Sequence, residues 1–193
     1  YNKKLIYKDK KLVNWDTALQ TAISDLEVVQ KETQSNLYFI DYQIEDSIEK
    51  ITIATTRPET MMGDTAIAVN PNDKRYISLV GKNVIIPLVN RRIKIITDHY
   101  ADPEQGSGAV KITPAHDFND YMVGKRNKLQ IINIFEKDGK INSNGIKDFV
   151  GLDRFEARKL IINKLKENDQ LVKIEQIKNK VPYGDRSNTI IEP

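Results

Sequence analysis

The chain has 193 residues, with 30 Lys and Arg against 27 Asp and Glu and a formal net charge of +3. This length suits one sizeable core, or one core with a small appendage. The charge surplus is too small for a sequence-blind DNA binder of the histone type, although a local basic groove stays possible. Because the sequence contains no cysteine, it excludes a disulfide-stapled fold, a cysteine nucleophile and thiolate metal sites.

The composition, 39% apolar and 30% charged, is typical of globular cytosolic proteins. No apolar run approaches the roughly 18 residues that span a bilayer. Residues 1–11 alternate lysine with apolar residues and lack the apolar core of a signal peptide. We therefore expect a cytoplasmic protein without a membrane anchor. Since the first residue is not Met, we also expect the chain to begin inside a longer parent.

In the first half of the chain the pattern predicts mostly short strands. Residues 23–29 alternate weakly and suit a strand or a linker. β-Rich runs predict strands over 37–40, 48–55, 64–69, 84–89 and 93–96, and residues 73–80 suit a short helix that Gly81 ends. Pro87 indicates that its strand lies at a sheet edge or bulge, because proline cannot donate to the ladder.

The second half adds both substantial helices. Strands are predicted over 109–112, 129–135 and 171–177, a helix over 117–126, and a longer helix over about 153–168. Ala157, Ile161 and Leu165 recur at helical spacing in the longer helix. Many short strands with turns between them do not fit regular βαβ winding. The pattern predicts an α+β fold with a mixed, β-barrel-like core and helices packed on the outside.

Hydroxyl groups and one guanidinium gather in Thr55–Thr60 (TTRPET), where a predicted strand ends. Arginine presents a fork of donors, so this segment suits recognition of an anion or a ribose. The simpler interpretation is a turn in which Pro58 begins a short helix and Thr56 caps it. The residues alone leave both interpretations open.

A glycine-rich bend, Gly106–Gly108, precedes the predicted strand that carries Lys111 and Thr113. Alternation places these two side chains on the same face of the strand. Lys111 is either a solvated charge on the outer face or a cation that points into the mouth of a barrel, toward an acidic or phosphate partner. The Gly-x-Gly pattern is a weak phosphate-loop signal, because the third glycine and the following helix of that motif are missing.

Two carboxylates, Asp117 and Asp120, lie at the start of the next predicted helix. Helical spacing places them on one face with Gly124, and the helix dipole stabilises anions at this end. Alternatively, Asp117 is only the N-cap and Asp120 a first-turn charge. Because the pair directly follows the strand of Lys111 and Thr113, we expect a cation and two anions to converge there.

Other chemistries fit the sequence poorly. His99, His116 and Asp117 are a thin set of metal ligands without Cys or a His-x-x-x-His helix, so we predict no metal site. The sequence has no Gly-x-Ser-x-Gly elbow, which disfavours a serine hydrolase. It also lacks a Walker loop and a full dinucleotide fingerprint, which disfavours nucleotide-cofactor chemistry.

Two longer stretches carry a family resemblance: Ile53–Thr65 (IATTRPETMMGDT) and Gly108–Asp120 (GAVKITPAHDFND). Both resemble signature segments of the editing domain of valyl-tRNA synthetases, which are class I synthetases. Leucyl enzymes usually continue with Asp-Thr after Arg-Pro, and isoleucyl enzymes usually replace the arginine. The resemblance extends over nearly the whole chain through Asn14-Trp15, Leu19–Asp25, Gly151–Arg158 and Arg186–Pro193.

The resemblance implies an editing domain that activates no amino acid, because the His-Ile-Gly-His and Lys-Met-Ser-Lys-Ser signatures of the synthetase ATP site are absent from the sequence. It implies a strand from the synthetase core over residues 1–33, the editing domain over 34–175 and a return strand over 176–193. No cofactor is expected in this piece, since ATP and Mg²⁺ belong to the parent enzyme. The expected partners are a mischarged valine tRNA and the rest of the synthetase chain, and the expected state is a monomer.

The resemblance also implies a set of site residues. Thr56 would line the pocket and help to exclude misfits, and Asp117 would support the site or orient water. Gln105 stands where many family members carry an aromatic residue, which weakens stacking on the terminal base by this loop. The implied catalytic residues are Lys111, Asp117 and Asp120, and the implied substrate-binding residues are Thr56, Arg57, Thr60 and Thr113.

In this set, Arg57 and Thr60 would hold the terminal adenosine or the aminoacyl ester. Lys111 and Thr113 would contact the threonyl group, and Asp120 its α-ammonium or hydroxyl. A fixed carboxylate suits an ammonium because a charge-assisted hydrogen bond is roughly twice as strong as a neutral one. Lys111 would also stabilise the developing oxyanion.

The implied function is hydrolysis of threonine wrongly esterified to valine tRNA. An apolar pocket rejects the extra hydroxyl of threonine by only ~10², a value established for valyl-tRNA synthetases themselves rather than obtained from these residues. A polar pocket favours threonine instead, because bound valine would leave a buried polar group without a hydrogen bond, which costs about 1–3 kcal/mol. A positioned water, assisted by the free ribose hydroxyl, would need no side-chain nucleophile. The alternatives are an isoleucyl-type domain that deacylates valyl-tRNA, and a non-catalytic module that binds the tRNA acceptor end.

Overall fold

The computed structural model describes residues 1–3 and 5–193. Two α-helices and several short 3₁₀ turns accompany the strands. The strands are β1 (Asn14–Asp16), β2 (Thr21–Ile23), β3 (Val28–Ile44), β4 (Lys50–Thr55), β5 (Ala66–Val69), β6 (Asn83–Ile85), β7 (Arg92–Thr97), β8 (Ala109–Ile112) and β9 (Leu171–Gly184). The helices are α1 (Phe118–Arg126) and α2 (Arg154–Glu167), and the 3₁₀ turns are η1 (Asp25–Glu27), η2 (Pro58–Gly63), η3 (Ile77–Leu79) and η4 (Lys147–Phe149).

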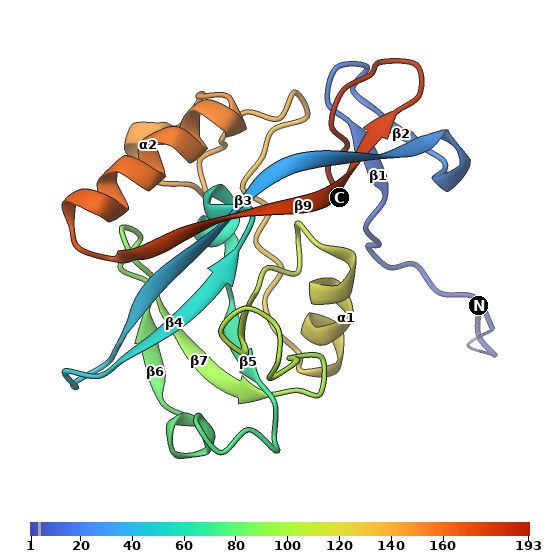
Figure 1. Cartoon of the computed structure of the whole chain (residues 1–193). Coiled ribbons are helices and arrows are strands. Elements are labelled where there is room, and N and C mark those ends of the chain that lie inside the picture. The colour runs from blue at the N-terminus through green and yellow to red at the C-terminus, as the bar shows by residue number, and fades with distance from the viewer. Residues whose placement is uncertain (4) are drawn as a thin grey trace.

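Within the described residues, a 7-stranded sheet in the order β4-β3-β6-β7-β5-β8, with β9 paired to β3, forms the centre of the molecule. Only β5 and β7 pair in parallel; the other neighbours of this sheet are antiparallel. The end strands β4 and β8 contact each other, so the sheet curls into a half-barrel, and α1 and α2 lie outside it (Figure 1). The predicted α+β fold with a barrel-like core is confirmed. No helix in the described part of the chain is long and apolar enough to cross a membrane.

Strand β5 is buried on both faces and separates two apolar clusters. Its side chains alternate, so Ile67 and Val69 pack into the larger core while Ala66 and Ala68 pack with Val123 beneath α1. The small alanines let the helix approach the sheet closely. A Cβ at Gly124 would lie 2.7 Å from Cγ of Pro114, so α1 rests directly on the turn that follows β8.

Helix α2 forms as predicted. Asp153 caps it by accepting a 2.8 Å hydrogen bond from the backbone N–H of Phe155. Ala157, Ile161 and Leu165 are fully buried on one face, as their helical spacing predicts.

We expect Ile161→Ala to lower the free energy of unfolding by about 2–5 kcal/mol, because it leaves a cavity in a core that cannot fully collapse. Leu160 is the matched control, since it is the preceding residue of the same helix and is 41% exposed. Leu160→Ala should cost less than about 1 kcal/mol. Urea denaturation of both variants measures the difference, and equal losses would place the buried face of α2 elsewhere.

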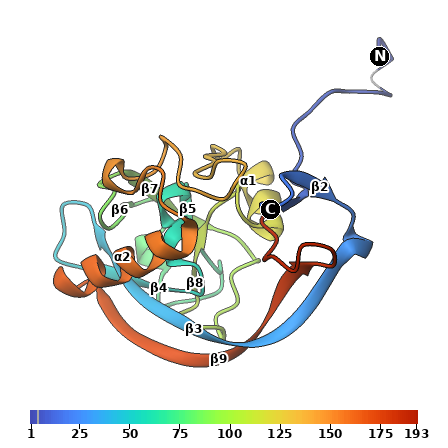
Figure 2. The same cartoon turned by 90° about the horizontal axis from the view of Figure 1, so that it is seen from above.

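Strands β3 and β9 continue beyond the barrel as a long two-stranded ribbon, from the pair Val28–Gly184 to the pair Ile40–Leu171. Figure 2 shows this β3–β9 ribbon arching around one side of the molecule. The sequence predicted only its barrel ends, at 37–40 and 171–177. The implied domain boundaries at 33/34 and 175/176 fall within these continuous strands and stay predictions.

The C-terminal segment returns to β1 near the far end of the ribbon. Trp15 and Glu192 exchange backbone hydrogen bonds of 2.7 and 3.0 Å, which joins the residues just before the C-terminus to β1 (Figure 1). This contact brings the Glu192 side chain toward the body of the molecule.

The predicted strand over residues 129–135 is wrong, although Ile131, Ile132 and Ile134 are apolar and β-branched. Its backbone groups bind outside a ladder: the N–H of Ile134 donates to Nε2 of His116 at 3.0 Å, and the carbonyl of Asn133 accepts from the side chains of Asn142 and Asn144. Only an isolated bridge at Phe135 is strand-like.

Two further predicted elements are shorter than expected. The helix over 73–80 is wrong except for η3, because Asp73 accepts hydrogen bonds from the backbone and side chain of Arg75 and turns the chain instead. The strand over 84–89 ends at Ile85, and Pro87 lies in the turn that follows it.

Candidate functional site

Lys111 points into the molecule, and its exposed fraction is 7%. Its ammonium donates to Oγ1 of Thr60 at 2.8 Å, to Oδ1 of Asp64 at 3.1 Å and to Oγ1 of Thr113 at 2.5 Å. The inward interpretation of Lys111 therefore holds, and its partner is acidic. All three ammonium hydrogens are engaged within the protein.

Asp120 joins this group through the backbone, since its Oδ2 accepts from the N–H of Thr113 at 2.8 Å. The close approach of α1 to the turn after β8 makes this contact possible. Asp117 is the N-cap of α1, and its Oδ1 accepts from the N–H groups of Asn119 and Asp120 at 2.8 and 3.0 Å. We call Lys111, Thr60, Asp64, Thr113 and Asp120 the Lys111 cluster.

Both acidic groups of the Lys111 cluster are harder to ionise than in water. Burial raises the pKa of Asp64 above its ordinary value, and the Lys111 charge and three hydrogen bonds offset only part of this rise. Burial also raises the pKa of Asp120, to about 7, with Lys111 lowering it and the Asp117 charge raising it. Asp120 therefore titrates near neutral pH.

Asp64 is the member of the cluster to which sequence reasoning assigned no role. It is fully buried, and besides Lys111 it accepts hydrogen bonds from Thr113 at 2.6 Å and from the hydroxyl of Tyr42 at 2.7 Å. One signal pointed to it: Asp64 is an acid in an apolar run between Met61-Met62 and Ala66–Val69. Such a buried acid requires partners.

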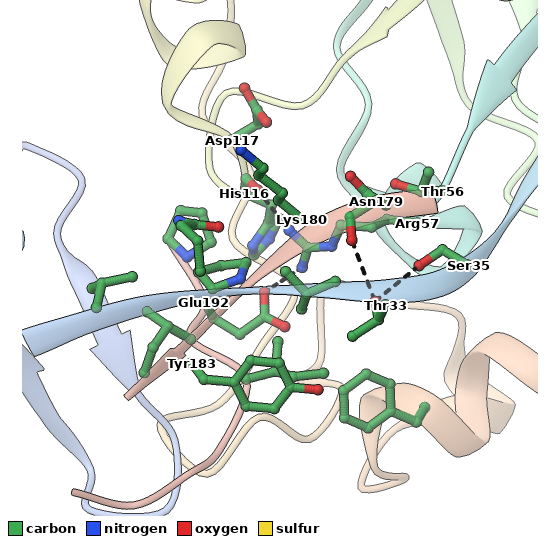
Figure 3. A pocket seen from close by; sticks show the side chains of 18 of the residues that line it. Thr33, Ser35, Thr56, Arg57, His116, Asp117, Asn179, Lys180, Tyr183 and Glu192 are labelled. Atoms are coloured by element: carbon green, nitrogen blue, oxygen red, sulfur yellow. Dashed lines mark hydrogen bonds and ion pairs between the residues drawn. The ribbon is translucent and has the colours of Figure 1, made fainter. Parts of the chain in front are cut away.

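A groove of about 650 Å³ lies between the concave side of the β3–β9 ribbon and the turns that carry Arg57 and Asp117. Figure 3 shows its side chains. Those labelled come from the ribbon (Thr33, Ser35, Asn179, Lys180 and Tyr183) and from the body and the C-terminal segment (Thr56, Arg57, His116, Asp117 and Glu192).

Two turns, residues 57–60 and residues 113–117, connect this groove to the Lys111 cluster. Thr60 donates to the carbonyl of Arg57 at 2.9 Å, and the N–H of His116 donates to the carbonyl of Thr113 at 3.0 Å. Of the seven predicted site residues, the structure places Thr56, Arg57 and Asp117 in the groove. It gathers Thr60, Lys111, Thr113 and Asp120 in the buried cluster.

Arg57 is held by the protein itself. Its guanidinium donates to the carbonyl of His116 at 2.9 Å, lies 3.4 Å from Oε1 of Glu59 and forms an ion pair with Glu192 (Figure 3). A substrate group that binds Arg57 must compete with Glu192. Pro58 begins η2 as predicted, but the predicted cap by Thr56 is wrong, since no side chain caps this turn.

The ion pairs of Glu192 and Glu59 connect the C-terminal segment, η2 and α2. Glu192 lies 2.9 Å from Nε of Arg154, and Glu59 accepts two 2.7 Å hydrogen bonds from Arg158. Burial acts to raise the pKa of Glu59, but the Arg158 hydrogen bonds and the charges of both arginines hold it below its ordinary value.

We expect Glu192→Ala to destabilise the chain by about 3–5 kcal/mol, because it leaves the buried Arg154 with only the more distant Asp153, at 3.8 Å. Glu175 is the control: it pairs with Lys173, and both side chains are about half exposed. Glu175→Ala should cost at most about 1 kcal/mol. Thermal unfolding of both variants checks this, and equal small losses would contradict a stabilising role for Glu192.

His116 is buried and neutral. Burial lowers its pKa well below the ordinary value, and the charges of Arg57 and Lys111 lower it further. Its ring packs edge-on against Phe135 at 4.7 Å. The described residues contain no group of three His, Asp or Glu side chains arranged to hold a metal ion.

Comparisons with known proteins agree with the motifs. The family model described as tRNA synthetases class I (I, L, M and V) matches residues 1–182. Proteins named valine–tRNA ligase from Pelagibacter ubique (strain HTCC1062) and Lactococcus lactis subsp. lactis (strain IL1403) are 69% and 54% identical over 193 residues. These matches take in 100% of the chain and 22% of each relative, so the chain spans about a fifth of their length.

A solved structure shares the fold. The crystal structure of the ternary complex of Agrobacterium radiobacter K84 agnB2 LeuRS with tRNA and LeuAMS matches 77% of this chain, and 20% of that chain, with a TM-score of 0.56 and 21% identity. The resemblance to valyl-tRNA synthetases is confirmed by the relatives. The chain belongs to the class I tRNA synthetase family (I, L, M and V).

Proposed function

We propose that this chain is an editing domain that hydrolyses threonine wrongly esterified to valine tRNA. The observation that supports this most is the Lys111 cluster, because it gathers an ammonium, two hydroxyls and two carboxylates from the two segments that carry the family motifs. Such a polar site favours a side chain with a hydroxyl over its methyl counterpart, since the methyl group would leave buried polar groups unpaired.

In the proposed complex, Lys111 and Thr113 contact the threonyl group and Asp120 binds its α-ammonium. Arg57 and Thr60 hold the terminal adenosine or the ester, Thr56 lines the approach, and Asp117 supports α1 and the water. Water attacks the ester carbonyl, the bond to the ribose oxygen breaks, and that oxygen leaves with a proton. The products are free threonine and tRNA. The free ribose hydroxyl assists, so no side-chain nucleophile is needed.

Incubation of the chain with three charged tRNAs tests this function. Valine tRNA mischarged with threonine should be deacylated under single-turnover conditions, whereas valine tRNA charged with valine should survive. Survival of bound threonyl-tRNA would favour the non-catalytic binding module. Deacylation of valine from isoleucine tRNA, without action on the threonyl ester, would favour the isoleucyl-type alternative.

We expect weak tRNA binding that falls as salt rises, because the contacts are largely to phosphate. Besides Lys173, which pairs with Glu175, the ribbon offers three exposed lysines: Lys31, Lys178 and Lys180. If each neutralises one phosphate, affinity should fall about 40-fold between 50 and 200 mM salt. Filter binding across this range measures the slope. Tight binding that salt does not change would contradict the proposal.

The proposal includes the setting of the domain. We take the chain to act as a monomer in the cytoplasm, joined to the rest of a synthetase that uses ATP and Mg²⁺ elsewhere. The domain itself needs no cofactor for the hydrolysis, since water and the ester are the only reactants.

A further inference from the structure

Asp64 lies on the buried side of the Lys111 cluster. Its side chain has no exposed area, whereas that of Lys111 keeps 8%. A ligand therefore reaches the Lys111 ammonium first, since Thr60 and Thr113 keep only 2% and 1% of their area exposed. Asp64 acts on a ligand through the three groups that it binds, Lys111, Thr113 and Tyr42, and its charge also acts on Asp120.

The hydrogen bonds fix the direction of the hydroxyl protons. Lys111 is only a donor, so Thr60 and Thr113 must each accept from it. An ionised carboxylate is only an acceptor, so the Thr113 proton must point to Asp64. The Thr60 proton points to the carbonyl of Arg57. Each threonine oxygen then has one lone pair left and no free proton.

This arrangement selects the kind of group that the cluster accepts. A ligand hydroxyl can donate to the remaining lone pair of Thr113 or Thr60. A methyl group offers no proton, and a carbonyl oxygen meets only another acceptor. The selection depends on the negative charge of Asp64, because without it the Thr113 proton is free to turn toward the ligand.

We propose that Asp64 is a positioning residue that sets the specificity of the site, by holding Thr113 as an acceptor for the side-chain alcohol of the substrate. This inference rests on the proposed function and deepens it. Asp64 does not touch the substrate. It holds the Lys111 ammonium in place and orients the Thr113 hydroxyl, and the tyrosine behind it completes its own hydrogen bonds.

The test compares the single-turnover deacylation rates of threonyl- and valyl-tRNA by the wild-type chain and by Asp64→Asn. The asparagine keeps the shape but replaces the carboxylate by one neutral acceptor oxygen, so it holds the Lys111 ammonium and the Thr113 proton less firmly. We expect the ratio of threonyl to valyl rates to fall at least about ten-fold, mainly through the threonyl substrate. The control is Asp98→Asn, which neutralises another buried carboxylate, paired with Arg126 outside the cluster, and should leave the ratio unchanged.

A double-mutant cycle separates positioning from general loss of structure. If Asp64 acts through Thr113, Asp64→Asn should have little further effect on the ratio once Thr113→Val has removed the hydroxyl. If the effects of the two substitutions on the rate ratio multiply, the inference is overturned. An unchanged ratio in Asp64→Asn would also overturn it, provided that the wild-type chain hydrolyses threonyl-tRNA. A wild-type chain without activity would instead refute the proposed function.

If Asp64→Asn does not fold, as judged by circular dichroism, Tyr42→Phe takes its place. It removes only the hydrogen bond to Oδ2 of Asp64 and keeps the contacts of Lys111 and Thr113. The ratio should then fall about two- to five-fold because Asp64 is held less firmly. An unchanged ratio would overturn the inference here as well.

Discussion

Replacing Lys111 by methionine is expected to lower the rate of threonyl-tRNA deacylation by about 10²–10³, the loss typical of removing one preorganised charge or donor at a reacting carbonyl. The same change should lower the free energy of unfolding by about 3–5 kcal/mol, because Asp64 would remain buried without its counter-ion. Methionine has nearly the shape of lysine, so packing changes little. Single-turnover deacylation and urea denaturation measure the two effects.

The Lys111 ammonium already donates three hydrogen bonds within the protein. To donate directly to an oxyanion, the ammonium must release Thr60, Asp64 or Thr113. Lys140 is the control, since it is about half exposed and pairs with Asp138. Lys140→Met should leave deacylation unchanged and cost at most about 1 kcal/mol. A Lys111→Met chain with wild-type activity would remove Lys111 from the catalytic residues.

Asp120 should make deacylation depend on pH near neutrality. Because burial raises its pKa to about 7, its carboxylate is available to bind the α-ammonium only as pH rises through that value. We expect the wild-type rate to increase between pH 6 and 8, beyond the uncatalysed hydrolysis of the ester. Asp120→Asn should be roughly 10–100-fold slower at pH 8, since it loses a charge-assisted hydrogen bond to the ammonium.

The ratio of wild-type to Asp120→Asn rates isolates this carboxyl, because the substrate ammonium titrates identically in both reactions. A ratio that does not change with pH would contradict the assignment.

The stability of the chain should show the opposite trend for this group. Asp120 has an ordinary pKa near 3.9 when unfolded, so between that value and about 7 the folded state binds more protons. Its contribution to stability therefore falls as pH rises through this range, by about 1.4 kcal/mol for each unit of pKa difference. The stability of Asp120→Asn relative to the wild type should accordingly increase from pH 4 to pH 8.

The barrel and its helices were predictable because apolar residues there follow the period of each element. Ala157, Ile161 and Leu165 recur at helical spacing, and Lys111 and Thr113 share one face of their strand. The ribbon was not predictable beyond its barrel ends. Residues 30–36 of β3 are polar on both faces and are held by the backbone ladder with β9, so no apolar alternation marks them as a strand.

The site shows the same division. The motifs predicted that Lys111 would meet both Asp117 and Asp120. The structure joins Lys111 and Asp120 through Thr113, whereas Asp117 caps α1 and lies outside the cluster. The roles of Asp64 and Glu192 were not predictable, because they depend on contacts between residues far apart in sequence. Glu192 reaches Arg57 because the C-terminal segment pairs with β1 at Trp15, and no local pattern encodes that contact.

The most direct test of the proposed function is the ratio of single-turnover deacylation rates for threonine and valine esterified to the same valine tRNA. The two esters differ only in a hydroxyl against a methyl group. The Lys111 cluster predicts that the threonyl ester is hydrolysed at least about 100-fold faster, which corresponds to about 2.7 kcal/mol. Equal rates for the two esters, or no hydrolysis of either, would contradict the account.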